Sequence, residues 1–280
     1  MSTMIATDLE EFYGSRYDES LRLTSSIKGQ LELARVRELV TRHMPITATR
    51  VADIGGGTGV HAQWLRGDGY EVDLIDPIPR HVEAARACGL RAHLGDARDL
   101  PWDEDQFDAA LMAGPLYHLT DPDDRRAALR EAARVVRPGG LVAAVAFNRH
   151  ANLLGATLAN QLLERRPIID DIEAAGFSYR NDRVSPATYY TTIPELTDEM
   201  SSAGLNNIAI LGLTGPGGWL GIVIDAHFPD PADWPQTFAS QGPLETALAS
   251  ARAADEHPEL VPASTLWLAV GTVPAGTVAS

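Results

Sequence analysis

One short segment limits the folds open to this chain more than any other. The run Val51-Ala-Asp-Ile54 is apolar except for one acid, and it leads into a loop with glycines at positions 55, 56, 57 and 59. A helical pattern of polar and apolar residues follows from Val60 to Leu65. Because glycine adopts positive φ and lets a ligand approach the main chain, this strand, loop and helix predict a small-molecule binding site.

Short apolar segments and helical patterns alternate on both sides of this loop. Strands are expected at residues 50–54, 71–75, 91–94, 107–112, 141–147, 207–213 and 264–271. Helices are expected at residues 79–87, 122–136, 194–203 and 244–255, and before the first strand. Pro138-Gly139-Gly140 is expected to end the helix before the fifth strand. Alternation of this kind predicts an α/β fold, with a parallel sheet covered by helices on both faces.

Charge and composition exclude several functions. The chain of 280 residues has 38 acidic and 23 basic residues, a net charge of −15, and lacks the basic cluster that a nucleic-acid partner requires. It has no apolar run that could span a bilayer and no basic region at its start, so we expect a cytoplasmic protein without a membrane partner. The single cysteine, Cys88, excludes an internal disulfide and cannot build a thiolate site alone, so we expect no metal.

The spacing of the glycines distinguishes between ligands. A dinucleotide-binding loop needs a third glycine three positions after the second, and from Gly57 that position is Val60. The pattern D-x-G-x-G-x-G, from Asp53 to Gly59, instead resembles motif I of the class I S-adenosylmethionine (SAM) methyltransferases. The resemblance implies that Asp53, Gly55, Gly57 and Gly59 hold the methionine part of SAM, whose product is S-adenosylhomocysteine.

Three later segments resemble the same family. Asp76 and Pro77 follow the second strand, where an acid can accept hydrogen bonds from both ribose hydroxyls, because ligands of an open parallel sheet lie beyond the carboxyl ends of its strands. The run that begins Asp96-x-x-x-Leu-Pro resembles the adenine-binding segment, in which Asp96 accepts from the exocyclic amine and Ala97 N–H donates to a ring nitrogen. Arg134 to Gly140 resembles the R-x-L-x-P-G-G turn before the fifth strand.

The segment Ala113-Gly-Pro-Leu-Tyr-His-Leu119 follows the fourth strand. The transferred methyl group should point to this segment. It resembles a group of bacterial small-molecule SAM methyltransferases with G-P-L-Y-H-L at this place. In that group, N-terminal aromatics fold over the cofactor, and the tyrosine and histidine face the methyl group or the acceptor. The resemblance implies catalytic roles for Tyr17, Tyr117, His118 and Tyr190. It also implies cofactor contacts from Tyr17, Arg22 and Ala113.

Two points leave the acceptor site open. The run Tyr190-Thr-Thr-Ile193 replaces the Y-F-H-x-P type of run expected in that group, so the acceptor pocket can differ. Tyr117 and His118 also fit a simpler interpretation, as a core aromatic and a helix-capping imidazole.

The expected architecture is a Rossmann-like class I methyltransferase sheet with an N-terminal helical cap and an inserted lid. The cap is expected at residues 1–45, the SAM-binding core at 46–148, the lid at 149–192 and the C-terminal part of the core at 193–280.

The reaction implied is transfer of a methyl group from SAM to a small organic acceptor, in bacterial specialised metabolism, by a monomer or homodimer. C-methylation of an indole and N- or O-methylation all stay open, and His118 is the candidate base if the nucleophile arrives protonated. One alternative is a nicotinamide-dependent oxidoreductase, which the missing third glycine and the turn at residues 134–140 disfavour. The other is a SAM-binding regulatory subunit without turnover, which the aromatics near the methyl group disfavour.

Overall fold

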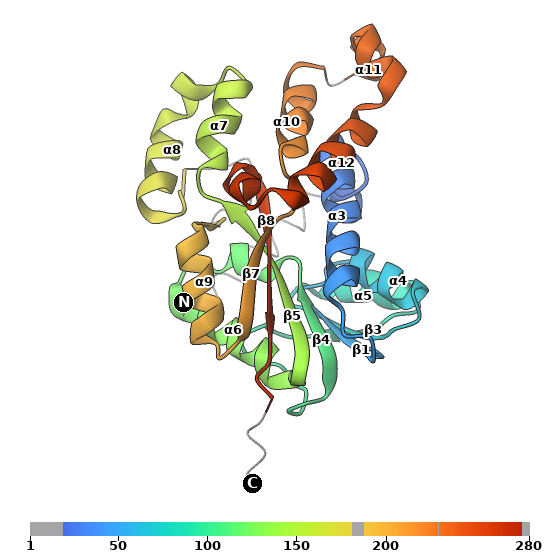
Figure 1. The fold of residues 1–280 in the computed structure, drawn as a ribbon. Helices are drawn as coiled ribbons and strands as arrows, with labels where there is room; N and C mark the ends of the chain where they lie inside the picture. The colour runs from blue at the N-terminus through green and yellow to red at the C-terminus, as the bar shows by residue number, and fades with distance from the viewer. Residues whose placement is uncertain (1–18, 181–187, 229, 276–280) are drawn as a thin grey trace.

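A single twisted sheet forms the centre of the protein (Figure 1). The computed structural model describes residues 19–180, 188–228 and 230–275. The strands are β1 (Arg50–Ile54), β2 (Glu71–Asp76), β3 (Arg91–Leu94), β4 (Phe107–Met112), β5 (Val136–Asn148), β6 (Tyr190–Thr191), β7 (Asn206–Gly212) and β8 (Leu266–Thr272). Their order across the sheet is β3-β2-β1-β4-β5-β8-β7, and β6 pairs with β5 outside this path.

The strands from β3 to β5 pair in parallel, whereas β8 runs antiparallel to both β5 and β7. The predicted α/β fold with a parallel sheet is therefore confirmed, with one antiparallel strand inserted near its edge. All carboxyl ends of β1, β2 and β4 meet at the same edge of the sheet, which is where such folds bind ligands.

The α-helices of the described residues cover the faces of the sheet or stand beyond one of its ends. They are α2 (Glu19–Arg22), α3 (Ile27–His43), α4 (Val60–Gly67), α5 (Pro79–Ala87), α6 (Pro122–Val135), α7 (Ala151–Leu158), α8 (Leu162–Ala175), α9 (Ile193–Ser202), α10 (Gly217–His227), α11 (Gln236–Gln241) and α12 (Pro243–Ala253). The buried faces of α3, α4 and α5 pack on one side of the sheet, and those of α6 and α9 pack on the other. Consecutive residues of β1, Val51 and Ala52, serve opposite sides, as the two-residue period of a strand requires.

The fifth strand begins earlier than expected. Val136 already pairs with Phe107, and the register then shifts so that Leu141 pairs with Ala109. The expectation that Pro138-Gly139-Gly140 ends the preceding helix is wrong, because α6 ends at Val135 and these residues form an irregularity inside β5. A Cβ on Gly140 would lie 2.6 Å from the Asp108 carbonyl oxygen, so the close approach of the two strands requires glycine there.

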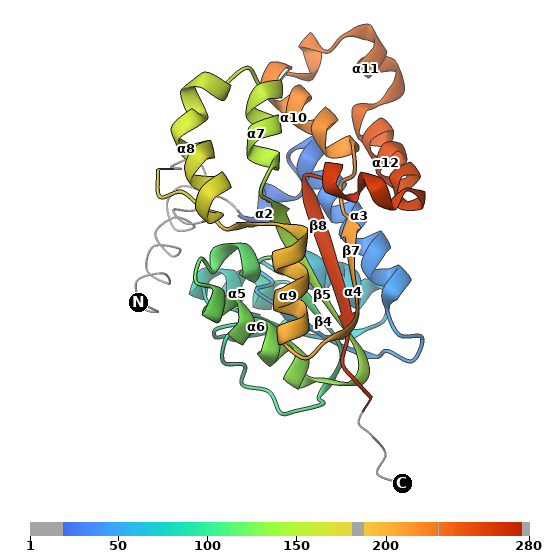
Figure 2. The ribbon, with the colours of Figure 1, turned by 60° about the vertical axis from the view of Figure 1, so that its left-hand side comes forward.

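A layer of helices stands beyond the carboxyl ends of β5 and β7 (Figures 1 and 2). The expected lid supplies α7 and α8, which follow β5. Three more helices, α10 to α12, come from residues 193–280, which were expected to belong to the core, and α10 packs against α12, α3 and α7. The helical layer is therefore larger than the sequence indicated, and the division at residues 45, 148 and 192 stays a prediction. None of the described helices has the length and apolar character needed to cross a bilayer.

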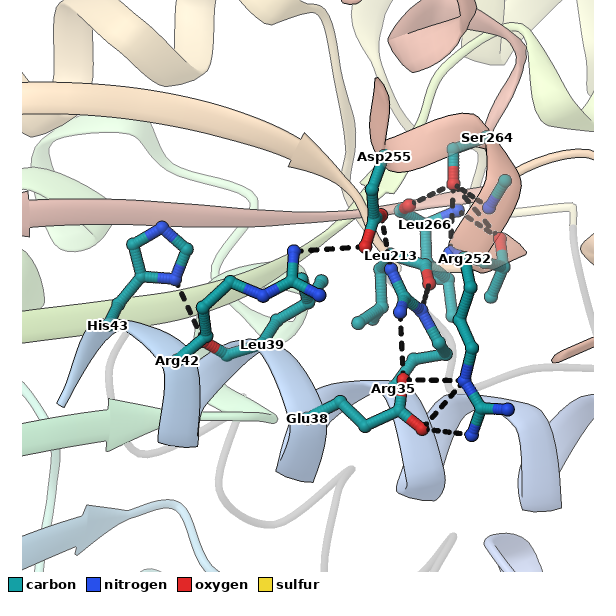
Figure 3. A network of polar contacts seen from close by, with 12 residues as sticks. Arg35, Glu38, Leu39, Arg42, His43, Leu213, Arg252, Asp255, Ser264 and Leu266 are labelled. Atoms are coloured by element: carbon teal, nitrogen blue, oxygen red, sulfur yellow. Dashed lines mark hydrogen bonds and ion pairs between the residues drawn. The ribbon is translucent and has the colours of Figure 1, made fainter. Parts of the chain in front are cut away.

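A fully buried arginine joins α3 to the C-terminal half (Figure 3). Arg35 Nε donates to the carbonyl oxygen of Leu213 at 3.2 Å, just after β7. Its guanidinium also pairs with Glu38 at 2.8 Å and with Asp255 at 2.5 Å. A buried charge that loses its partner is strongly destabilising, so these contacts fix α3 against the end of β7.

Replacing Arg35 with alanine should lower the free energy of unfolding by roughly 3 kcal/mol, because it leaves the groups around the buried guanidinium without their partner. Urea unfolding followed by circular dichroism measures this. Arg37→Ala is the matched control on the same helix, because its ion pair with Asp68 joins side chains that are 54% and 28% exposed. The control should lose less than about 1 kcal/mol. Equal losses in the two variants would contradict a special role for Arg35.

Candidate active site

The glycine loop connects β1 to α4 and lies against two neighbouring segments. Gly55 N–H donates to the carbonyl oxygen of Ile75 at 2.7 Å, which ties the loop to the end of β2. Gly55 and Gly57 have φ values of 68° and 56°, a region that side chains disfavour. A Cβ on Gly55 would lie 2.8 Å from Pro115 Cδ, in the 3-10 helix η1 (Pro115–His118) that follows β4. The loop therefore has space for a backbone but not for side chains.

The carboxylate of Asp76 holds this loop in place. Its Oδ2 accepts from Gly57 N–H at 2.9 Å, and its Oδ1 accepts from Ile78 N–H at 2.9 Å and lies 3.1 Å from His81 Nδ1. The residue is buried at the end of β2. Because a carboxylate offers about four lone-pair sites, Asp76 can still accept a hydrogen bond from a ligand hydroxyl.

Asp53 lies behind the loop and is fully buried. A Cβ on Gly56 would lie 2.6 Å from its Oδ2, so the carboxylate sits directly under the loop backbone. Burial raises the pKa of Asp53 to about 7, and the charge of Asp76 adds to the rise, whereas the N–H of Ala62 acts against it. Asp53 therefore titrates near neutral pH, in contact with the segment that forms the pocket floor.

A pocket opens at the ends of β1, β2 and β4, and most of the predicted residues meet there. Those on its wall are Arg22, Gly55, Gly57, Asp76, Pro77, Asp96, Ala97, Ala113, Tyr117 and His118. Asp53 and Gly59 are not on this wall, because both lie behind the loop surface. Tyr190 is also away from it, on β6, and Tyr17 lies outside the described residues.

Asp96 forms the far end of the pocket and is held by a neighbour. Arg98 Nε donates to Asp96 Oδ1 at 2.9 Å, and the same guanidinium pairs with Asp124 at 2.7 Å. Burial alone would raise the pKa of Asp96, but the hydrogen bonds and charge of Arg98 outweigh it and lower that pKa. Asp96 therefore stays ionised, with a fixed orientation.

His61, a buried residue on the pocket wall in the first turn of α4, is not among the site residues predicted from the sequence. Trp64 Nε1 donates to His61 Nδ1 at 3.1 Å, so the ring proton lies on Nε2, which has no partner among the described residues. Burial, helped by the charge of Arg22, lowers the pKa of His61 to about 3. His61 is thus a neutral donor at the pocket, and its place directly after the glycine loop was the available signal.

A row of aromatic rings leads away from the pocket. The ring centroids of Tyr117 and His118 are 4.7 Å apart, those of Tyr117 and Phe147 are 4.5 Å apart, and those of Phe147 and Tyr190 are 5.5 Å apart. The Tyr117 hydroxyl donates to the carbonyl oxygen of Ala113 at 3.3 Å. Burial, followed by the charge of Arg22, lowers the pKa of His118 to about 4, so its imidazole is neutral at pH 7. The row connects predicted residues that are distant in the sequence.

Asp53 should make the stability of the protein depend on pH. Its folded-state pKa of about 7 lies above the ordinary aspartate value of 3.8, so its contribution is complete below pH 3.8 and is lost as the pH rises through 7. The difference corresponds to roughly 4 kcal/mol. In urea titrations, the free energy of unfolding of Asp53→Asn minus that of wild type should therefore increase by roughly 4 kcal/mol between pH 4 and pH 8. A constant difference over that range would contradict the burial of a titrating carboxylate.

Three similarities to known proteins agree with this site. A family model described as a methyltransferase domain matches residues 51–140. An uncharacterized methyltransferase of Mycobacterium tuberculosis is 37% identical over 144 residues, which cover 50% of this chain and 57% of that protein. A demethylmenaquinone methyltransferase of Mycolicibacterium paratuberculosis is 31% identical over 169 residues, which cover 59% of this chain and 71% of that protein. The match thus spans little more than half of the M. tuberculosis relative.

The fold has solved counterparts as well. A SAM-dependent methyltransferase of Thermotoga maritima, described as a possible histamine N-methyltransferase, superposes with a TM-score of 0.57 at 19% identity and covers 95% of this chain and 98% of its own. At this identity the likeness concerns the fold alone. The fold agrees with the glycine loop, with the position of Asp76 and with the 31% identity to the demethylmenaquinone methyltransferase, of which this chain covers 71%. The chain therefore belongs to the class I SAM-dependent methyltransferases, and SAM is its cofactor.

Proposed function

We propose that this protein methylates a small aromatic acceptor that carries an ionisable O–H or N–H group. The observation that carries the proposal is the position of Tyr117 and His118 on the wall of the same pocket as Gly55 and Asp76. One side of the pocket thus has the features of a cofactor site, and the other offers an aromatic ring and a neutral imidazole.

The polar groups of the pocket fit SAM. We propose that Asp76 accepts from the ribose hydroxyls, that Asp96 and the N–H of Ala97 bind the adenine, and that His61 Nε2–H donates to the cofactor carboxylate. The last contact would satisfy a buried donor that has no partner among the described residues. When bound, SAM supplies an electrophilic methyl carbon attached to a sulfonium.

The protein's part in the reaction is to align the acceptor and remove a proton. The bond between the nucleophile and the methyl carbon forms as the carbon–sulfur bond breaks, and the sulfur keeps the electron pair. His118, neutral because its pKa is about 4, can accept the proton of the acceptor O–H or N–H. Tyr117, whose hydroxyl is engaged by the backbone, presents its ring as a wall for a planar acceptor.

The relatives and the sequence support an aromatic acceptor. One relative is named for demethylmenaquinone, a quinone. The resemblance of residues 114–119 to the G-P-L-Y-H-L group supports a place in specialised metabolism. A SAM-binding subunit without turnover is the remaining alternative. Transfer of labelled methyl from SAM, measured across indoles, phenols, amines and keto acids, separates the two, because turnover of an aromatic acceptor supports the proposal and its absence throughout the panel contradicts it.

Asp76 should contribute strongly to cofactor affinity. Asp76→Ala removes charge-assisted hydrogen bonds and releases Gly57, so S-adenosylhomocysteine should bind roughly tenfold to a hundredfold more weakly. Isothermal titration calorimetry measures this. Glu83→Gln, which changes an exposed acid on α5, controls for the loss of one negative charge and should leave the affinity unchanged. Equal affinity in Asp76→Ala and wild type would remove Asp76 from the cofactor site.

His118 should act as a base whose pKa is far below its usual value. His118→Ala should lower kcat by roughly 10²–10⁴ while leaving the affinity for S-adenosylhomocysteine unchanged. The wild-type kcat should not fall through pH 6.5, as it would with an ordinary histidine base, because His118 stays neutral down to about pH 4. Near-wild-type turnover in His118→Ala, Tyr117→Phe and the double variant would assign both residues to packing.

A further inference from the structure

Two basic side chains near the aromatic row have no anionic partner among the residues that the structure describes. Lys28, the only lysine of the chain, lies in the first turn of α3, and its Nζ is 5.9 Å from the centroid of the Phe147 ring. Across residues 19–180, 188–228 and 230–275, no carboxylate lies within ion-pair distance of this ammonium. Of its acidic neighbours, Glu32 is already paired with Arg22 at 2.9 Å, and Asp225 lies at the exposed surface of α10. Burial lowers the pKa of Lys28, as expected for an ammonium that lacks a close counter-ion.

Arg165 is the second unpaired cation. It lies on α8, and its Nε is buried without a hydrogen-bond partner in the described part of the chain. Burial raises the pKa of Tyr190, whereas a hydrogen bond from Asn152 and then the charge of Arg165 act in the opposite direction. The adjacent Arg166 differs, because it is exposed and pairs with Asp170 at 2.6 Å.

An amide donor completes the group. Asn152, on α7, lies within hydrogen-bonding reach of Tyr190 and lowers the pKa of that phenol, and its buried Nδ2 makes no hydrogen bond of good geometry to any described residue. The three side chains thus come from α3, α7 and α8, which belong to or adjoin the helical layer beyond β5 (Figure 2). All three are hydrogen-bond donors. Lys28 lies near Phe147, and Asn152 and Arg165 interact with Tyr190, at the opposite end of the aromatic row from His118.

Buried donors and cations of this kind favour one class of ligand. A buried cation without a counter-ion costs free energy. An anion with two acceptor oxygens would accept hydrogen bonds from several of these donors together. The chain has a net charge of −15, so its own carboxylates are plentiful, yet none of those in the described residues forms an ion pair with Lys28 or Arg165. The row of rings between His118 and the two cations also offers an apolar surface that suits a planar ligand.

We propose that Lys28, Arg165 and Asn152 bind a carboxylate of the methyl acceptor, so that the substrate is an aromatic acid whose ring lies along Tyr117 and Phe147. This inference rests on the proposed function. It places the nucleophilic atom of the acceptor near His118 and its carboxylate near Lys28. The carboxylate then selects among aromatic compounds and sets which ring atom faces the methyl group.

The first test compares acids with their uncharged isosteres. Indole-3-acetate is measured against indole-3-acetamide, and 4-hydroxyphenylacetate against 4-hydroxyphenylacetamide, by calorimetry in the presence of S-adenosylhomocysteine. Each acid should bind at least tenfold more tightly than its amide. Equal binding of acid and amide, or tighter binding of the amide, would overturn the proposal.

The second test uses variants of the two cations. Lys28→Met and Arg165→Met should each weaken the binding of the acids by roughly tenfold to a hundredfold and leave the amides unaffected. Lys28→Arg, which keeps the charge, should retain most of the preference for acids and guards against loss through misfolding. Arg166→Met is the matched control and should change nothing. Equal weakening of acids and amides in Lys28→Met and Arg165→Met would show a structural role and overturn the proposal.

The two proposals fail in different ways. If neutral aromatic compounds are methylated and acids are neither bound nor methylated, the proposed function stands and the carboxylate site is wrong. If acids bind in a manner that depends on Lys28 but no acceptor is methylated, the carboxylate site stands and the proposed function is wrong.

Discussion

The hydrogen bonds of Asp76 are the constraint on which the geometry of the site depends. One carboxylate joins three elements, because it accepts from the loop after β1 at Gly57 and from the start of α5 at Ile78, while it is itself carried by the end of β2. The positive φ of Gly57 directs its N–H toward this carboxylate. These hydrogen bonds therefore fix the shape of the loop that lines the pocket.

Arginines bring the second half of the chain to this site. Arg149 Nε donates to the carbonyl oxygen of Tyr190 at 3.1 Å and its guanidinium pairs with Glu195 at 2.6 Å. Arg125 lies 3.5 Å from the centroid of the Tyr189 ring and pairs with the buried Glu199 at 2.7 Å. These contacts fix the two-residue strand β6 beside β5, and so place Tyr190 against Phe147.

Local signals explain what the sequence could predict. β1 and α5 have the predicted bounds, because a buried apolar run and a proline at the helix start are strong signals over a few residues. The early start of β5 depends on the pairing of Val136 with Phe107, which no local pattern contains. Likewise, the role of His61 depends on Trp64 fixing its tautomer, and the contact of Tyr190 with Phe147 depends on the fold of residues far apart in the chain.

Charge is the clearest case of information that only the structure holds. In the sequence, Arg165 and Arg166 are equivalent neighbours, and Lys28 is one basic residue in an acidic chain. In the structure, Arg166 is neutralised by Asp170 and the buried Arg35 by Asp255. Lys28, in contrast, lies near the Phe147 ring, and Arg165 has a buried Nε, with no carboxylate paired to either among the described residues. Because a fold that can place a carboxylate beside a buried cation usually does so, a missing partner is itself an observation. This missing partner is the basis on which the carboxylate of the acceptor is proposed to bind at Lys28 and Arg165.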